Sequence, residues 1–416
     1  MKISQLFTKT SKTSTADADS INAKLLTQAG FITKQMAGVY IFLPLGLRVL
    51  NKIEDIIREE MNTVGGNEVL MPTLTLEENY EVTGRDKTLN DVLFRTSGAG
   101  DSKMVLNPTH EEIVTPLVQK FVFSYQDLPK SVYQIQTKFR NEARAKSGLL
   151  RGREFRMKDM YSFHTDEKDL DKYYEEVIEA YFRVYERVGL GNGRTVLTYA
   201  SGGAFSKYSH EYQTLAQSGE DTIFICEKCN IAVNKEIADE QNVCPKCGNK
   251  KLVEKKAIEV GNIFKLKDKF TTPFKFFYQD EKGKQQVAQM GCYGIGPSRI
   301  LGTLVEVFHD DRGIIWPESV APYKVYLMAL GKEEEGKKEA DKIYKQLVEE
   351  GIEVLYDDRE NASAGEKLAD ADLIGLPYRV VVSKKTLEKG GVELKARNSD
   401  KVEIIEVKKL IKIFNS

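Results

Sequence analysis

The sequence has no long uninterrupted hydrophobic segment. Its longest apolar run, AGVYIFLPLGL before Arg48, contains Pro44 and is far shorter than the ~20 residues that a membrane helix needs. The N-terminal stretch MKISQLFTKTSKTSTADADS lacks the apolar core and cleavage site of a secretory leader. These absences argue against a membrane protein and against export, and we therefore expect a cytoplasmic protein.

The chain also has almost no net charge. Its 61 lysines and arginines are balanced by 62 aspartates and glutamates, which leaves a formal charge of -1. No global field attracts nucleic acid, so any contact with RNA must come from local basic patches. With 416 residues, of which 41% are hydrophobic, the chain can bury sizeable cores in two or three domains.

Cysteine is scarce as well, and four of the five cysteines lie in two CxxC repeats. ICEKCN and VCPKCG contain Cys226, Cys229, Cys244 and Cys247. Disulfides are rare in the cytosol, and paired CxxC repeats at this spacing are typical of a tetrahedral structural zinc site. Free thiols or a redox pair are the alternatives, although a redox CxxC usually occurs singly. We therefore predict a small zinc module at residues 222–256.

Residues 139–163, FRNEARAKSGLLRGREFRMKDMYSF, contain an unusual concentration of arginine, namely Arg140, Arg144, Arg151, Arg153 and Arg156. Burying these side chains unpaired would not stabilise a fold, so a polyanion is the natural partner. A strand–loop–strand arrangement would bring Arg151 and Phe155 opposite Arg140 and Glu142. One nucleoside triphosphate would then engage all four: Arg140 and Arg151 would bind phosphates, Glu142 an adenine amino group, and Phe155 the base. A basic hairpin that binds nucleic acid without chemistry is the alternative.

A second motif, QMGCYGIGPSR at residues 289–299, favours the nucleotide. Its glycines permit close approach of the backbone, and Arg299 lies where a helix begins that continues into LGTLVEVF. The motif has neither the GK[ST] of a P-loop nor the GxGxxG of a dinucleotide fold.

FRNE, RGREF and GIGPSR together resemble motifs 2 and 3 of the class II aminoacyl-tRNA synthetases, and the segment from Leu50 to Pro72 resembles motif 1. Within that class the chain is most similar to the bacterial prolyl-tRNA synthetases. The similarity extends over nearly the whole chain through the strings NPTHEE, MKDMYSF, SHEYQTLAQSGED, EVGNIF, GCYGIGPSR and DDRENASAGEKLADADLIGLPYRVVVS. Many bacterial members have a large editing domain between motifs 2 and 3, where this chain has only the cysteine module.

The resemblance implies an enzyme that activates L-proline with ATP and Mg²⁺ and transfers it to tRNA(Pro). Catalysis is expected from Arg140 and Arg299, and ATP binding from these two residues with Glu142, Arg151, Phe155 and Glu259, the last sharing Mg²⁺ with the phosphates. By position, the proline site is expected to comprise Thr109, Glu111, Arg140, Asp159, Phe163, His210 and Cys292. Asn262 stands where the bacterial family commonly has histidine. Motif 1 implies a symmetric homodimer.

The spacing of apolar residues and the positions of glycine and proline predict an α/β (α+β) chain. Apolar residues at helical spacing from Tyr173 to Val188 end at Gly189, and VYQIQTKF, TVLTYA and AIEVGNIFKL are typical of strands in a mostly antiparallel sheet. After WPESVAPY, a βαβαβ pattern predicts a parallel sheet in a separate domain. We expect a catalytic domain at 1–221 and 257–320, the zinc module at 222–256, and an anticodon-binding domain at 321–416.

Two other functions remain open at this stage. A class II paralogue that charges another amino acid, such as threonine, would share the ATP motifs. A non-catalytic RNA-binding relative would share the fold, but it would not need Arg140, Glu142, Arg151, Phe155 and Arg299 together. All five are present.

Overall fold

A computed structural model describes residues 1–13, 20–331 and 333–415. Its contacts divide the chain into two compact units. The larger unit consists of Met36–Val39 and Ile53–Thr303, and the smaller of Met1–Gln35, Tyr40–Lys52 and Leu304–Ser416. These bounds differ from the predicted segments, because residues near the N-terminus group with the C-terminal part of the chain. In the described residues, no helix is both long and apolar enough to cross a membrane.

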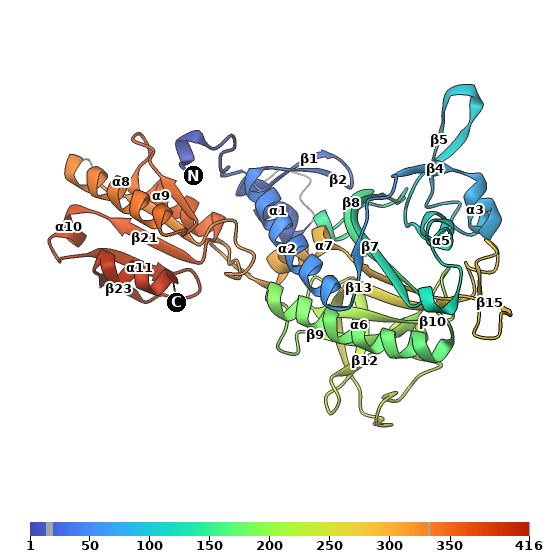
Figure 1. The fold of residues 1–416 in the computed structure, drawn as a ribbon. Coiled ribbons are helices and arrows are strands. Elements are labelled where there is room, and N and C mark those ends of the chain that lie inside the picture. The colour runs from blue at the N-terminus through green and yellow to red at the C-terminus, as the bar shows by residue number, and fades with distance from the viewer. Residues whose placement is uncertain (14–19, 332, 416) are drawn as a thin grey trace. The chain divides into compact units, whose positions relative to one another are not determined.

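The larger unit is built on a nine-stranded sheet with the order β10-β9-β12-β11-β13-β16-β8-β7-β3 (Figure 1). Its strand pairs are antiparallel except for β12 with β9 and β3 with β7, so the mostly antiparallel sheet predicted from the sequence is confirmed. The strands are β3 Asn67–Glu68, β7 Lys130–Phe139, β8 Glu154–His164, β9 Thr195–Ser201, β10 Tyr208–Leu215, β11 Asp221–Cys226, β12 Ile231–Asn234, β13 Val253–Lys267 and β16 Gln289–Ile295.

Helix α6 (Glu167–Val188) covers one face of this sheet (Figure 1). Asp166 caps its start by accepting a hydrogen bond from the Asp169 N–H, and Gly189 ends it with a left-handed φ of 95°. The side chains at helical spacing, including Tyr174, Val177, Tyr181 and Val184, are buried against the sheet. The predicted amphipathic helix and its end at Gly189 are therefore confirmed.

Lys158 is buried between α6 and the sheet without a carboxylate partner. Its Nζ donates to the Tyr181 hydroxyl at 2.5 Å and to the Tyr293 carbonyl oxygen at 2.9 Å. Burial lowers the pKa of this amine to about 7, because an ammonium ion loses its hydration there. In the unfolded chain the same amine stays protonated up to a pKa of about 10.4.

This difference predicts a pH dependence of stability. Between pH 7 and pH 10 the unfolded chain binds more protons at this residue, so Lys158 adds stability as the pH rises, by up to about 1.4 kcal/mol per pH unit. Relative to Lys158→Met, the wild type should gain stability from pH 7 to pH 9 in urea denaturation followed by circular dichroism. The exposed-lysine control Lys168→Met should show a constant difference from wild type. A constant difference for Lys158→Met as well would contradict the prediction.

Motifs 1 and 3 have the predicted elements. Helix α2 (Pro44–Thr63) precedes β3, and α7 (Pro297–Val307) begins directly after Gly296. Proline suits the first turn of a helix because its missing N–H would have no partner there.

Beside the main sheet lies a three-stranded sheet with the order β4-β6-β5. Its strands and neighbouring helices are β4 Leu74–Leu76, α3 Glu78–Thr83, α4 Arg85–Thr88, β5 Phe94–Ser97, β6 Lys103–Leu106 and α5 Glu111–Gln119. The remaining short elements are α1 Ile21–Gln28, β1 Ile32–Met36, β2 Val39–Phe42, β14 Phe277–Gln279, β15 Gln285–Val287, β17 His309–Asp310 and β18 Gly313–Ile314, with 3-10 turns at Ile3–Gln5, Ala99–Asp101, Tyr125–Asp127, Gly148–Leu150 and Lys235–Ile237.

The cysteine segment is connected to the main sheet by its flanking strands. Strands β11 and β12, which flank Cys226 and Cys229, pair with β13 and β9 and belong to the nine-stranded sheet. Only the turns and the second CxxC project from that sheet. The cysteine spacing predicts the metal site, whereas the sheet that the flanking strands join is set by tertiary contacts.

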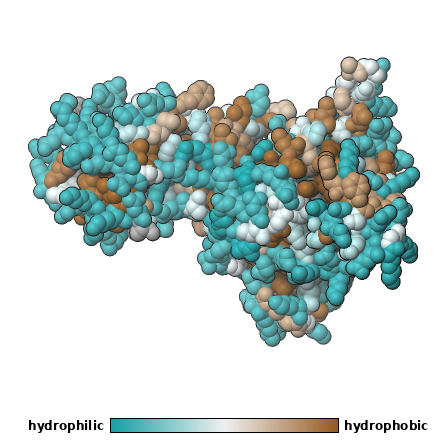
Figure 2. Space-filling model, in the orientation of Figure 1, coloured by the Kyte–Doolittle hydropathy of each residue, from teal (hydrophilic) through white to brown (hydrophobic). Residues whose placement is uncertain are grey.

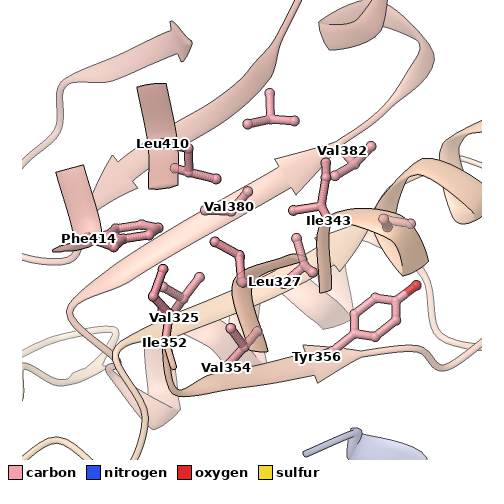
Figure 3. Packing of buried hydrophobic residues seen from close by; sticks show 14 of the residues in the cluster. Val325, Leu327, Ile343, Ile352, Val354, Tyr356, Val380, Val382, Leu410 and Phe414 are labelled. Carbon is pink, nitrogen blue, oxygen red and sulfur yellow. The ribbon is translucent and has the colours of Figure 1, made fainter. Parts of the chain in front are cut away.

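The C-terminal part of the smaller unit contains a five-stranded sheet with the order β20-β19-β21-β22-β23. Its core includes Leu327, Ile343, Val380 and Leu410 (Figure 3). The predicted parallel βαβαβ unit is present, but the last two strands pair antiparallel, so the sheet is mixed. The elements are β19 Val325–Ala329, α8 Glu334–Glu349, β20 Val354–Asp357, α9 Ala364–Ile374, β21 Tyr378–Val382, α10 Lys384–Leu387, β22 Val392–Ala396, β23 Val402–Ile405 and α11 Val407–Asn415.

Candidate active site

A cavity of about 340 Å³ lies in the larger unit, and most of the predicted site residues line it. They come from the segment just before α5, from the loop between β7 and β8, from β8, β13 and β16, and from the start of α7. The residues that line it are Thr109, Arg140, Glu142, Arg151, Phe155, Asp159, Glu259, Cys292 and Arg299. The smaller unit has a cavity of about 480 Å³, but none of the predicted site residues lines it.

The two arginine motifs meet in this cavity. The Arg140 guanidinium carbon lies 5.2 Å from the centre of the Phe155 ring, and Arg151 Nε donates to Glu142 Oε2 at 2.9 Å. Arg299 Nη1 donates to Glu259 Oε2 and to the Glu259 carbonyl oxygen, both at 2.9 Å. The predicted pairing of Arg140 and Glu142 with Phe155 and Arg151 therefore exists, although β7 ends at Phe139 and the contacts are made from an irregular loop.

Arg140 and Arg299 act on each other electrostatically. Burial and the positive charge of Arg299 lower the pKa of Arg140, whose guanidinium has no hydrogen bond or ion pair with the described residues. A guanidinium that is half-buried without an ion pair is costly unless an anion joins it. The cavity therefore has the electrostatics of a site for a polyanion.

The other arginines of the motif have structural partners. Arg156 pairs with Glu54 at 2.8 Å, and Arg153 Nε donates to the Glu142 carbonyl oxygen. Arg144 is exposed and does not line the cavity. Sequence reasoning overestimated the number of arginines available to a polyanion, because it could not see that Glu54, a hundred residues away, pairs with Arg156.

Glycines shape the wall that motif 3 contributes. Gly294 and Gly296 line the cavity, and a Cβ atom on Gly296 would lie 3.1 Å from the Arg299 Cβ. A side chain at Gly296 would therefore crowd the arginine that faces the cavity.

A second group of polar residues gathers at the Thr109 side of the cavity. The Thr109 hydroxyl donates to Glu111 Oε2 at 2.7 Å, and the Cys292 thiol donates to Glu111 Oε1 at 3.3 Å. Glu111 itself is fully buried behind these two residues. Lys138, 2.7 Å from Asp159 Oδ1, lowers the pKa of Asp159 although burial opposes this. The Thr109 side of the cavity is therefore negatively charged and rigidly held.

Besides the buried Glu111, two predicted members of the proline site do not line the cavity. Phe163 is buried in the neighbouring hydrophobic cluster, where its ring centre lies 5.2 Å from that of Phe276. His210 lies on the α6 side of the sheet, where its Nδ1 is 2.8 Å from the Tyr174 hydroxyl and burial lowers its pKa to about 4. Successive side chains of a strand point to opposite faces, so the neighbour of His210, Glu211, faces the cavity instead.

Glu211 is a site residue that sequence reasoning missed. Its Oε2 accepts hydrogen bonds from Gln213 and Asn234 at 2.9 and 3.0 Å. Burial, together with the charge of Glu259, raises its pKa to about 8. Asn262 Nδ2 lies within 3.4 Å of Glu211 Oε1 and 3.3 Å of Glu259 Oε1, so it bridges these two carboxylates. The alternating direction of side chains along β10 was the signal that could have identified Glu211 as a site residue.

The four cysteines of the CxxC repeats come together as predicted. Their sulfur atoms all lie within 4.8 Å of one another, and those of Cys226 and Cys247 are 3.7 Å apart. None forms a disulfide, and a tetrahedral zinc with Zn–S bonds of about 2.3 Å places sulfurs about 3.8 Å apart. The geometry of the cluster therefore fits zinc.

The fold and this cavity define a class II aminoacyl-tRNA synthetase. Residues 94–308, more than half of the chain, match the model of the tRNA synthetase class II core domain (G, H, P, S and T), and residues 324–416 match that of the anticodon binding domain.

Curated relatives indicate which family within the class II synthetases the chain belongs to. The chain is 40% identical to the proline–tRNA ligase of Anaplasma phagocytophilum, over 98% of each chain, and 39% identical to that of a Drosophila simulans Wolbachia, over the whole of both chains. The chain therefore belongs to the proline–tRNA ligase family. The ligase of Dehalococcoides mccartyi strain 195 is 32% identical, but its alignment extends over 560 positions, so it has segments without counterpart in these 416 residues.

Solved structures agree in fold. The prolyl-tRNA synthetase of Giardia lamblia in complex with prolyl-adenylate has a TM-score of 0.78 and 19% identity, and the match covers 95% of this chain and 77% of that one. The enzyme of Cryptosporidium parvum with halofuginone and AMPPNP has a TM-score of 0.77 and 19% identity, covering 94% of this chain and 77% of that one.

Proposed function

We propose that this chain is an ATP-dependent proline–tRNA ligase that forms prolyl-adenylate and transfers the prolyl group to the 3′ end of tRNA(Pro). The observation that carries the proposal is that two arginine motifs face each other in one cavity, beside the buried carboxylate of Glu111. Membership of the family supports the same activity.

The geometry suggests how ATP is activated. The proline carboxylate attacks the α-phosphorus, and pyrophosphate leaves. No side-chain nucleophile is needed, since the residues act by positioning the reactants and stabilising charge. Arg140 and Arg299 face the phosphates, Arg151 reaches the terminal ones, and the base stacks on Phe155 with Glu142 at its amino group.

The same cavity has the carboxylates that a magnesium ion prefers. Glu259 and Glu211 both line it, and the charge of Glu259, together with burial, raises the pKa of Glu211. This donor set fits Mg²⁺, which would be shared between Glu259, with Glu211 nearby, and the phosphates. Magnesium bound there would offset phosphate charge.

For proline, we propose that Thr109 and Glu111 hold the secondary ammonium group, with Arg140 at the carboxylate and Asp159 and Cys292 beside the ring. Phe163 supports this site from the hydrophobic cluster behind it. His210 is not included, because it faces α6.

The tRNA would contact both recognised domains. Residues 324–416 match an anticodon-binding domain, and we propose that they bind the anticodon of tRNA(Pro). A cytoplasmic location accords with a role in protein synthesis. The cysteine cluster would hold a structural zinc through four thiolates. This zinc would take no part in the reaction.

We propose a homodimer formed through motif 1. A groove of about 260 Å³ beside β3 is lined by apolar side chains that include Val69, Leu117, Phe121 and Val132. Phe121 and the nearby Phe123 are 67% and 71% exposed. The visible face of the molecule is otherwise mainly hydrophilic, with apolar side chains in patches (Figure 2). Exposed aromatic rings in a groove are typical of interface anchors.

Phe121→Asp is therefore expected to weaken dimerisation about 30-fold or more, because it places an unpaired charge in the interface. Sedimentation equilibrium or light scattering over a range of concentrations would measure this. Val348→Asp, which changes an exposed apolar side chain on α8, should leave the association unchanged. A wild type that is monomeric at micromolar concentration would reject the proposed dimer.

Pyrophosphate exchange with a panel of amino acids tests the proposed activity. Proline should support exchange, with much weaker exchange for threonine. Exchange that depends on threonine would instead indicate the paralogue, and no exchange with any amino acid would indicate the RNA-binding relative.

A further inference from the structure

Arg85 is buried beside the proposed proline site, although it belongs to none of the sequence motifs. It is the first residue of α4, directly after Gly84, whose φ of 71° turns the chain inward. Only 2% of the side chain is exposed, and its guanidinium carbon lies 4.7 and 5.2 Å from the ring centres of Phe205 and Phe270. Burying a guanidinium is costly, so this position calls for an explanation beyond packing.

Its partners are two carboxylates. Arg85 Nη1 donates to Glu111 Oε2 at 2.9 Å and to both oxygens of Glu112 at 3.1 Å. Burial opposes the charged form, but Glu112 and Glu111 together raise the pKa of Arg85 above its ordinary value. One cation is therefore shared by two fully buried carboxylates.

Glu111 links Arg85 to the cavity. Its two oxygens accept from the Thr109 hydroxyl and the Cys292 thiol, and both of these residues line the cavity. When both carboxylates are ionised, the three charged groups leave one negative charge in a dry site. A ligand with a single positive charge at this end would neutralise it.

We propose that Arg85 is a positioning residue for the amino acid: its hydrogen bond holds the Glu111 carboxylate against Thr109, in the place where it would receive the secondary ammonium group of proline. This inference rests on the proposed function, in which Thr109 and Glu111 receive that group.

Removing Arg85 would leave Glu111 and Glu112 side by side without their shared cation. Two carboxylates in one buried site tend to retain a proton, and burial already raises the pKa of Glu112 despite Arg85. The Glu111 carboxylate would lose the partner that fixes its position, and a proton retained by the pair of carboxylates would weaken their attraction for the ammonium group. The other titratable or charged groups that act on Glu111 or Arg85 are Tyr80, His110, Lys138, Arg140, Tyr161, Lys269 and Cys292.

The test is steady-state pyrophosphate exchange with Arg85→Met, Arg85→Lys and wild type. Arg85→Met should raise the KM for proline about 100-fold, as expected for loss of one partner from a buried charge cluster, while the KM for ATP changes less than about twofold. Its kcat/KM for proline should rise from pH 6.5 to 9, where that of wild type is flatter. Arg85→Lys restores the charge and should recover part of the loss.

A matched control is Arg95→Met, because Arg95 lies on β5, pairs with Glu77 and does not line the cavity. It should leave both KM values and the pH profile unchanged. A purely structural role for Arg85 predicts a lower melting temperature with KM values for proline and ATP that change in parallel, or not at all, and either result would overturn the inference.

Failure of this inference can be distinguished from failure of the proposed function. If wild type shows no proline-dependent exchange, the proposed function itself fails. If wild type is active and Arg85→Met does not fold, Arg85→Lys decides: an unchanged KM for proline and an unchanged pH profile overturn the inference, whereas a selective rise in the KM for proline supports it.

Discussion

Arg299→Ala is expected to lower kcat for prolyl-adenylate formation about 100-fold or more while the fold persists. Arg299 donates to Glu259 and to the Leu150 carbonyl oxygen, and it lies close enough to Arg140 to lower the pKa of that residue. It is thus held in place before ATP arrives, and such a preorganised cation stabilises charge in the transition state more than in the ground state. Pre-steady-state adenylate formation with saturating proline and ATP would measure the effect.

Arg140→Ala should produce a loss of similar size, with a larger effect on substrate binding because this guanidinium contacts the Phe155 ring but has no hydrogen bond or ion pair with the described residues. Arg95→Met is the control for a lost surface arginine. Circular dichroism and the melting temperature would show that each variant is folded. A near-normal rate for folded Arg299→Ala would reject its role in motif 3.

Loss of zinc is the second large effect that we expect. Cys244→Ser should reduce the metal content from about one zinc per chain to nearly none, because structural zinc is held by all four thiolates and its binding stabilises the fold around it. Hydrogen exchange in residues 235–252 should then rise about 100-fold or more, since this stretch has little hydrophobic core of its own.

The same variant should retain most of its proline activation. Strands β11 and β12 pair with β13 and β9 in the main sheet, so the loss of ordered structure should be confined to the turns and the second CxxC. Cys292→Ser is the control for metal content, because Cys292 lies outside the cluster and should leave the zinc unchanged. Absence of zinc by elemental analysis, in wild type purified without chelators, would reject the site.

Sequence reasoning succeeded where the signal was local or periodic. The helix that ends at Gly189, the hairpin of β7 and β8, and the helix after Gly296 all follow from spacing, caps and turn residues. The four cysteines were predicted as a cluster because ligand spacing in the chain reflects tetrahedral geometry.

Its errors share one cause. His210 was placed in the proline site although it faces α6, and Arg156 was assigned to a polyanion although it pairs with Glu54. The two antiparallel strands that extend the predicted parallel unit of the C-terminal sheet were not predicted. In each case the deciding contact is with a residue that is distant in the sequence, which no local pattern reveals.

The sequence by itself therefore determined the class of chemistry, through the resemblance of FRNE, RGREF and GIGPSR to the motifs of the class II synthetases. Only the tertiary structure decided which side chains face the cavity, because strand alternation and sheet order set the direction of each one. It also revealed Glu211 and Arg85, whose roles arise from buried charges brought together from separate elements. Charge in a dry interior depends on its neighbours in space, and these are fixed only when the chain has folded.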